Sequence, residues 1–122
     1  MPELAPEPVP ERDGTGSGAA TDRVLAALAD PMRRRLLDLL ASRGESTATA
    51  LAADLPVSRQ AVLQHLTVLG RVGLVTSTRS GRERRFAVRS EQLTATAAWM
   101  IRLARQWDTR LDAIRSIAES PE

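Results

Sequence analysis

Several residue types are scarce or missing in this chain of 122 residues. It has no cysteine, which excludes disulfides, thiolate metal sites and thiol catalysis. Aromatic residues make up only 2% of the chain, so the core must be built from aliphatic side chains, which favours packed helices over a β-sandwich. There is no apolar run of 18 residues and no recognisable signal peptide, and we therefore expect a cytosolic protein.

Charge is distributed unevenly along the chain. All seventeen cationic residues are arginine, and the formal net charge is +2. Residues 1–20 are rich in proline, glycine, glutamate and alanine, carry a net charge of −3 and lack an apolar stripe. This composition predicts a disordered tail, followed by one small domain over residues 21–119. The acidic tail could compete with nucleic acid for a basic surface, but an inert extension is the simpler interpretation.

A helix is predicted from the stretch that begins at Ser58. The hydroxyl of Ser58 can cap the free N–H groups of the first turn, and Val62, Leu66 and Leu69 then form an apolar stripe that can dock on a core. The remaining face is polar. Arginine can bind guanine and glutamine can bind adenine through paired hydrogen bonds, so such a face suits readout of the DNA major groove. The residues expected to contact DNA here are Ser58, Arg59, Gln60, Leu63, Gln64, His65 and Thr67.

A two-stranded ribbon is predicted after this helix. Leu74 and Val75 begin one strand, a turn at 80–81 follows, and Phe86 lies on the buried face of the return strand. Residues 58–89 contain seven arginines and one acid, a net charge of +6. A basic ribbon beside a polar helix is the arrangement of a winged helix-turn-helix, in which the helix reads bases and the wing contacts phosphates. The wing residues expected to contact phosphate are Arg79, Arg82, Arg84 and Arg85.

Two further helices are predicted upstream. Thr21 or Asp22 can cap the first, and Asp30 followed by Pro31 is typical of the start of the second, because proline suits the first turn of a helix. The second helix contains a run of arginines at 33–35. We interpret Arg33 and Arg34 as part of a solvated helix face, since they fall outside the apolar stripe of this helix.

The segment between these helices and Ser58 completes a helix-turn-helix. Gly44 is expected to end the second helix, and a short extended linker, with at most a single β-bridge, follows it. Thr49 is expected to cap a third helix over residues 50–55, which Pro56 stops. A short helix, a three-residue turn and a longer helix make a helix-turn-helix.

A long last helix is predicted from Ser90 or Glu91 to about Glu119. Its apolar residues recur at alternating steps of four and three, a heptad pattern sustained over more than three heptads. A domain this small cannot cover such a stripe, so we expect it to pack against the first helix and a second copy. A ligand pocket lined by Trp99 and Trp107 is the alternative. The residues expected at the dimer interface are Val24, Leu28, Met100, Ala104, Trp107, Leu111 and Ile114.

Three motifs in this order resemble the ArsR-type (arsenic-repressor-like) winged helix-turn-helix transcriptional regulators: LADPMRRRLLDLL, VSRQAVLQHLTVLGRVGLV and SGRERRFAV. The resemblance covers residues 22–118. It implies a mainly α fold with a small β-hairpin wing placed between the fourth and fifth helices. It also implies a homodimer paired through its first and last helices. Such a dimer binds double-stranded DNA at an inverted repeat and represses its own or a neighbouring promoter.

The chain departs from the metal-sensing members of this family. Those members carry cysteines in the third helix, or acids and histidines along the last helix. Here the third helix has no cysteine, and Asp108 and Asp112 lie in the last helix without a histidine. The only histidine, His65, is expected to meet a phosphate or a neighbouring side chain. We therefore expect no metal and no other cofactor. Leu63 stands where the family commonly has serine; it could contact a thymine methyl group, or lie less deep.

Two other classes of function fit the sequence less well. A protein-interaction module that kept the helix-turn-helix shape without reading DNA would not need a basic ribbon. An enzyme would need a catalytic constellation, but Ser58 and His65 lie seven residues apart on one helix. That spacing corresponds to about 10 Å of helical rise, which is too far for contact between a nucleophile and its base. We therefore expect a sequence-specific DNA-binding regulator and not an enzyme.

Overall fold

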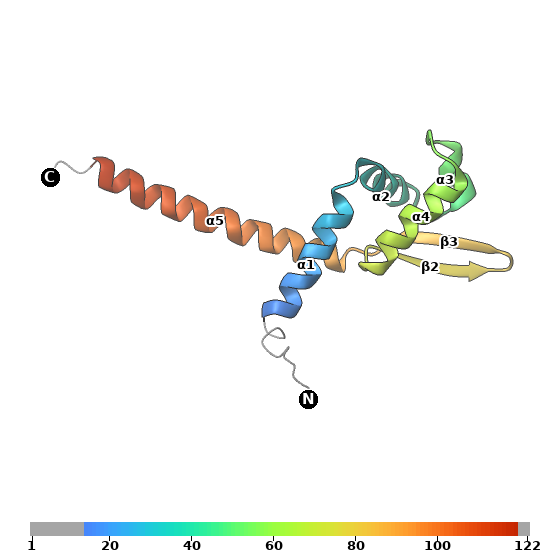
Figure 1. The fold of residues 1–122 in the computed structure, drawn as a ribbon, viewed down its shortest axis with the longest axis horizontal. Helices are drawn as coiled ribbons and strands as arrows, with labels where there is room; N and C mark the ends of the chain where they lie inside the picture. Colours follow the sequence, from blue (N-terminus) through green and yellow to red (C-terminus); the bar gives the residue numbers. More distant parts are fainter. Residues whose placement is uncertain (1–13, 120–122) are drawn as a thin grey trace, which may run out of the picture.

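The computed structural model describes residues 14–119, which form five helices and a three-stranded sheet. Helices α2, α3 and α4 gather around the sheet, the β2–β3 hairpin projects from this group, and α5 extends away from it beside α1 (Figure 1). The mainly α architecture with a hairpin wing was predicted. The elements are α1 (Gly14–Leu28), α2 (Pro31–Arg43), β1 (Ser46–Thr47), α3 (Ala48–Ala53), α4 (Arg59–Arg71), β2 (Val75–Ser80), β3 (Glu83–Val88) and α5 (Glu91–Glu119).

The first helix begins earlier than the sequence predicts. We expected a cap at Thr21 or Asp22, but α1 begins at Gly14, so residues 14–20 belong to the helix and not to the predicted tail. Thr21 is buried within α1 instead of capping it. Helix α1 packs against α5, and such tertiary packing stabilises helical turns that composition alone would not. The rest of the predicted tail, residues 1–13, lies outside the described residues.

Capping residues set both ends of α2, as predicted. The carboxylate of Asp30 accepts hydrogen bonds from the backbone N–H groups of Met32, at 2.8 Å, and Arg33, at 3.3 Å. Pro31 occupies the first turn. Gly44 ends the helix with a φ of 86°, a conformation that a residue with a side chain rarely adopts.

The third helix begins two residues earlier than predicted. Thr47, and not Thr49, is the N-cap, and its hydroxyl accepts a hydrogen bond from the N–H of Ala50 at 3.1 Å. The reason is a long-range contact, because Ser46 and Thr47 form β1 and pair with β3. This pairing holds Thr47 in the extended conformation that an N-cap requires. The predicted linker is therefore a short strand.

Helix α4 carries the centre of the core. Ser58 caps it by accepting a hydrogen bond from the N–H of Ala61 at 3.0 Å. The predicted stripe of Val62, Leu66 and Leu69 is at most 2% exposed. Apolar side chains of α1, α2 and α3, and of the segment that contains β2 and β3, complete the cluster. Its other buried members are Val24, Ala27, Leu36, Leu37, Leu40, Ala48, Leu51, Leu74, Val75 and Phe86.

The sheet ties the wing to the helix-turn-helix. Its strand order is β1-β3-β2, and all pairs are antiparallel. Strands β2 and β3 are joined by a two-residue turn at Gly81 and Arg82, where Gly81 has a φ of 64°. Phe86 in the central strand pairs with Ser46 of β1 on one side and Ser77 of β2 on the other. The base of the wing is therefore bonded to the segment that leads into α3.

Helix α5 extends well beyond the rest of the fold (Figure 1). It begins at Glu91, as predicted, with the N–H of Thr94 donating to the carbonyl of Ser90 at 2.9 Å. Every residue from Trp99 to Glu119 is exposed. The apolar heptad stripe thus lacks a cover over most of its length within one protomer. Over residues 14–119, no helix combines the length and the apolar character that a membrane crossing demands.

Candidate nucleic-acid interface

The face of α4 that points away from the core is polar. Gln60 and Gln64 are exposed on it. Thr67 is also exposed, but its hydroxyl donates to the carbonyl of Leu63 at 2.9 Å. The hydroxyl of Ser58 is engaged in capping the helix. The amides of Gln60 and Gln64 are therefore the groups best placed to bind a base edge.

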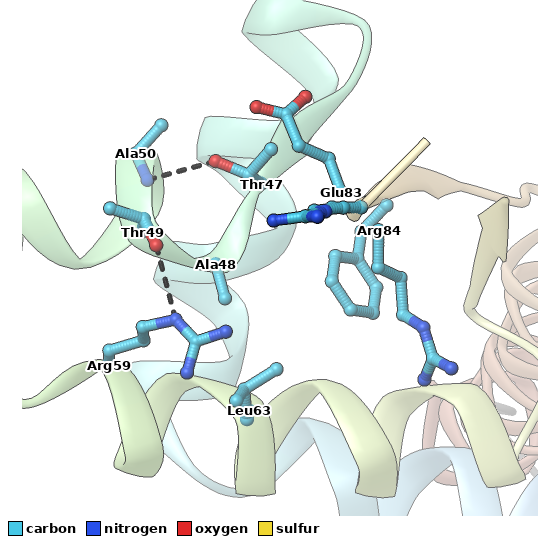
Figure 2. A pocket seen from close by; sticks show the side chains of 10 residues that line it. Thr47, Ala48, Thr49, Ala50, Arg59, Leu63, Glu83 and Arg84 are labelled. Atoms are coloured by element: carbon cyan, nitrogen blue, oxygen red, sulfur yellow. Dashed lines mark hydrogen bonds between the residues drawn. The ribbon is translucent and has the colours of Figure 1, made fainter. Parts of the chain in front are cut away.

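Two clefts flank Leu63 between α4 and the wing. The first, of about 390 Å³, lies between the start of α3, the start of α4 and the hairpin turn (Figure 2). The second, of about 320 Å³, lies between the later turns of α4 and β2. Leu63, Arg84 and Phe86 line both clefts. Leu63 is half-buried and packs against the core. It is therefore less available for contact with DNA than Gln60 and Gln64, which are exposed on the same helix.

Arg59, the first residue of α4, turns toward α3 (Figure 2). Its Nε donates a hydrogen bond to the hydroxyl of Thr49 at 3.1 Å. This bond uses one of the five N–H donors of the guanidinium group and leaves both terminal nitrogens available. Arg59, Arg82 and Arg84 all line the first cleft. The carboxylate of Glu83 also lines it, so three positive groups and one negative group leave the rim of the cleft with an excess of positive charge. Such a rim favours anions such as DNA phosphates.

Strand register places two wing arginines on the side of the hairpin that faces α4. Arg79 and Arg84 are partners across the β2–β3 ladder, and paired residues share a face. Arg84 also shares a face with Phe86, because side chains two residues apart point to the same side of a strand. Arg82, in the turn, is exposed. Arg82 and Arg84 thus line the first cleft together with Leu63 of α4, and Arg79 shares the face of Arg84.

Arg85 differs from the other arginines of the wing. It was expected to contact phosphate with them, but alternation places it on the opposite face of β3. There its guanidinium lies 3.2 Å from a carboxylate oxygen of Glu83 and 3.8 Å from one of Glu45. The sequence held the signal for this difference, since Arg85 and Phe86 are adjacent in a strand. Arg85 thus has two acidic neighbours on that face, so we rank it below Arg79, Arg82 and Arg84 as a candidate phosphate contact.

Arg33 is not part of a solvated face of α2, contrary to our interpretation of the sequence, whereas Arg34 is exposed as expected. The Nε of Arg33 donates to the carbonyl of Ala27 at 2.7 Å, and Nη1 of Arg34 donates to the carbonyl of Leu28. The side chain of Arg33 is only 18% exposed. Both arginines thus satisfy carbonyl groups at the end of α1, which would otherwise lack a partner in the helix.

Asp30 and His65 complete the surroundings of Arg33. Nη1 of Arg33 lies 3.7 Å from the Asp30 carboxylate and 3.5 Å from Nδ1 of His65. Burial alone would raise the pKa of Asp30. The backbone N–H groups of Arg33 and Met32 and the positive charge of Arg33 outweigh this effect and hold the pKa of Asp30 below its usual value. His65 therefore meets a neighbouring side chain, one of the two roles expected for it.

The residues predicted for a dimer interface fall into two groups. Val24 is 1% exposed and belongs to the protomer's own core, so its assignment to the interface is wrong. Leu28 is half-buried and packs against the same core. The others form an exposed apolar row along α5. In this row Met100 is 47% exposed, Trp107 54%, Leu111 49% and Ile114 62%, and Ala104 is also exposed.

The two tryptophans of α5 do not line a common pocket in the described protomer. A shallow hollow beside Trp107 is lined by Leu103, Gln106 and Arg110, without Trp99. The guanidinium of Arg110 lies 5.8 Å from the centre of the Trp107 ring, within the range of a cation–π contact. The alternative of a ligand pocket between the indole rings therefore has no support within one protomer.

Possible metal ligands are dispersed. Within residues 14–119, no three side chains of histidine, cysteine, aspartate or glutamate are grouped so that they could hold a metal ion. Asp112 on α5 is 3.4 Å from Arg115, and Asp108 is exposed one turn earlier. The arrangement of charges instead favours an anionic partner that spans α4 and the wing.

Comparison with known proteins gives consistent matches. A family model described as a helix-turn-helix domain matches residues 28–78. The HTH-type transcriptional regulator Rv2034 of Mycobacterium tuberculosis is 38% identical over 99 residues, which cover 81% of this chain and 89% of the relative. The transcriptional repressor SdpR of Bacillus subtilis is 28% identical over 90 residues, covering 74% and 99%. The solved structure of an ArsR-like transcriptional regulator from Rhodococcus sp. RHA1 has a TM-score of 0.77 at 44% identity, covering 86% of this chain and 98% of that one.

Proposed function

The chain belongs to the ArsR family of winged helix-turn-helix transcriptional regulators, and on that premise we propose that it is a homodimeric repressor of a specific promoter, its own or a neighbouring one. Membership of this family makes it a DNA-binding regulator and not an enzyme. The observation that supports the proposal best is the shared orientation of two surfaces. Arg59 and Leu63 of α4 line one cleft together with Arg82 and Arg84 of the wing. Arg79 shares a face of the hairpin with Arg84, and Gln60 and Gln64 are exposed on the same helix as Arg59 and Leu63.

In the proposed mode of DNA binding, α4 contacts the bases and the wing contacts the phosphates. Gln60 and Gln64 bind base edges in the major groove, where a glutamine amide matches the donor and acceptor of adenine. Arg79, Arg82 and Arg84 bind phosphates, which carry charge but no sequence information. Arg59 lies at the boundary, with a guanidinium directed over the first cleft (Figure 2).

The proposed dimer forms through α5. Its exposed apolar row runs from Met100 to Ile114, about four helical turns. Water would otherwise surround two tryptophans and several aliphatic side chains of this helix. An exposed apolar surface of this length is typical of an interface between subunits. Two copies related by a twofold axis would present two α4 helices about one DNA turn apart, ~34 Å, and would prefer an inverted repeat.

The chain is also proposed not to sense metals through the usual sites of its family. It has no cysteine at all. Its only histidine lies beside the guanidinium of Arg33, which is always cationic and disfavours a second cation close by. Repression by occupation of the promoter agrees with the name of the relative SdpR, a transcriptional repressor. Release would then depend on an organic molecule, another protein or the concentration of the regulator itself.

Binding to the DNA upstream of its own gene tests the proposal. We expect a protected inverted repeat in a footprint, with an affinity that falls steeply as salt concentration rises. Replacing Arg84 by glutamine should weaken binding to all duplexes alike and reduce the salt slope by about one. Arg105→Gln, which removes an exposed arginine from α5, is the matched control and should leave the slope unchanged. Failure to bind any duplex at low salt would favour a protein-interaction module instead.

A further inference from the structure

Arg33 joins three elements that are far apart in the chain. It belongs to α2, its Nε donates to the carbonyl of Ala27 in α1 at 2.7 Å, and its Nη1 lies 3.5 Å from Nδ1 of His65 in α4. The carboxylate of Asp30, the N-cap of α2, lies 3.7 Å from the same guanidinium nitrogen. The guanidinium is thus held by the α1–α2 junction and makes a polar contact with the middle of α4.

The chemistry of this contact assigns the roles of its two partners. Arginine only donates, so in a hydrogen bond between these groups Nδ1 of His65 is the acceptor. The inner edge of His65 is therefore engaged by Arg33. Its side chain is half-buried, unlike the side chains of Gln60 and Gln64, which are exposed on the reading face of the same helix.

We propose that Arg33 is a positioning residue for DNA reading, which acts by holding His65 and so fixing the orientation of α4 relative to the α1–α2 junction. The inference rests on the proposed function, because it assigns α4 to the major groove. Helix α1 also packs against α5, the helix proposed to form the dimer. Arg33 therefore connects the dimer-forming part of the protomer with the helix that reads the bases.

Loss of this connection should affect specific binding more than general binding. A small change in the orientation of α4 moves the amides of Gln60 and Gln64 away from their base edges, whereas the wing still reaches phosphates. Binding to random DNA depends mainly on phosphate charge and should change little. The ratio of the affinities for operator and random duplex is thus the quantity that reports positioning.

Three substitutions of His65 separate this role from a direct contact with DNA. Asparagine places an amide oxygen near the position of Nδ1 and can still accept from Arg33. Glutamine reaches toward the position of Nε2 and can still donate to a phosphate, and leucine can do neither. We expect His65→Leu and His65→Gln to bind operator about tenfold more weakly with little change on random duplex, and His65→Asn to bind within about threefold of the wild type.

A double-mutant cycle tests the pair directly. Arg33→Met removes the guanidinium and keeps most of the aliphatic stem. If Arg33 acts through His65, the double variant Arg33→Met/His65→Leu should bind operator about tenfold more weakly than the wild type. Independent effects of the two substitutions would instead multiply to about a hundredfold loss. Arg71→Met, in the last turn of the same helix and exposed, is the matched control and should combine additively with His65→Leu. Unfolding midpoints of all variants show whether each remains folded.

The outcomes distinguish this inference from the proposed function. If the wild type binds no operator, the proposed function itself is wrong. If the wild type binds and Arg33→Met combines additively with His65→Leu, or if glutamine restores operator binding while asparagine does not, the positioning role is wrong. Rescue by asparagine alone, together with a non-additive cycle, supports it.

Discussion

Arg59 on α4 and Thr49 on α3 are joined by a hydrogen bond of 3.1 Å, from Nε of the guanidinium to the threonine hydroxyl. The bond spans the turn of the helix-turn-helix and holds a flexible side chain in one orientation before any DNA arrives. Ordering a long side chain on binding costs about 0.5–1.5 kcal/mol, so an arginine that is already ordered avoids part of this loss.

We predict that Thr49→Val weakens operator binding by about two- to tenfold, because Arg59 must then be ordered on binding. Thr49→Ser keeps the hydroxyl and is the matched control, with an expected affinity close to that of the wild type. Fluorescence anisotropy with labelled operator measures both. Equal affinities for the valine and serine variants would show that the bond does not prepare Arg59 for DNA.

The second prediction concerns how the stability of the fold changes with pH in the acid range. The pKa of Asp30 is lower in the folded protein than its ordinary value of 3.8. Its carboxylate therefore stabilises the fold fully above the ordinary pKa, and this contribution is lost as pH falls through the folded pKa. Asp30→Asn keeps a capping oxygen but cannot titrate. We expect the stability difference between wild type and Asp30→Asn to shrink as pH falls from about 5 to about 3.

Unfolding midpoints measured at each pH test this prediction. Asp38→Asn is the matched control, because Asp38 is an exposed acid on the same helix. Its midpoints should follow those of the wild type throughout the acid range. A pH-independent difference between wild type and Asp30→Asn would mean that the Asp30 charge does not contribute to stability.

The third prediction concerns a buried hydroxyl in α5. Thr96 is 2% exposed, and its hydroxyl has no hydrogen-bond partner in the described part of the chain. Leaving a buried polar group without a partner costs about 1–3 kcal/mol. Thr96→Val removes the group with almost no change in shape, so we expect it to increase the free energy of unfolding by about 1 kcal/mol.

Chemical denaturation of the two variants Thr96→Val and Thr94→Val tests the point. Thr94 lies two residues earlier on the same helix and is exposed, so the same change there should have little effect. A destabilised Thr96→Val variant would show instead that the hydroxyl is satisfied in solution.

The fourth prediction concerns the apolar row of α5. Trp107 is 54% exposed in the protomer and lies in the middle of the row. Trp107→Glu would bury a carboxylate in the proposed interface, which should weaken the dimer by about thirtyfold or more. Gln106→Glu adds the same charge at the neighbouring exposed position and should leave the dimer intact.

Sedimentation equilibrium across micromolar concentrations measures this dissociation. Circular dichroism checks that both variants keep their helical content. A Trp107→Glu variant that remains fully dimeric would place the subunit contact elsewhere on the protein.

Local signals in the sequence were sufficient for the elements whose ends are set by capping residues. Asp30 and Gly44 bound α2, and Ser58 starts α4, as predicted. The start of α3 was not predictable in this way, because Thr47 and Thr49 are both suitable caps. The choice between them depends on the pairing of β1 with β3, a contact between segments about forty residues apart along the chain.

The candidate site was predicted in its composition but not in its internal connections. The exposed glutamines of α4 and the basic wing follow from periodicity and charge. The contact between Arg33 and His65 depends on the packing of α2 against α4, which no local pattern specifies. In the wing, the alternation of side chains along β3 separates Arg84 from Arg85, a distinction that the net charge of the segment does not make.

Strand β1 has a consequence for the duplex. Its two residues bond the central strand β3 to the start of α3, and α3 packs against α4, so the wing is coupled to α4 through α3. In the proposed mode of binding, the distance between α4 in the major groove and the wing arginines on the neighbouring DNA backbone is therefore set by the protein. Any mismatch between this span and the local groove width must be taken up by bending or twisting of the DNA. Base steps that deform easily would then be favoured at positions that no side chain touches.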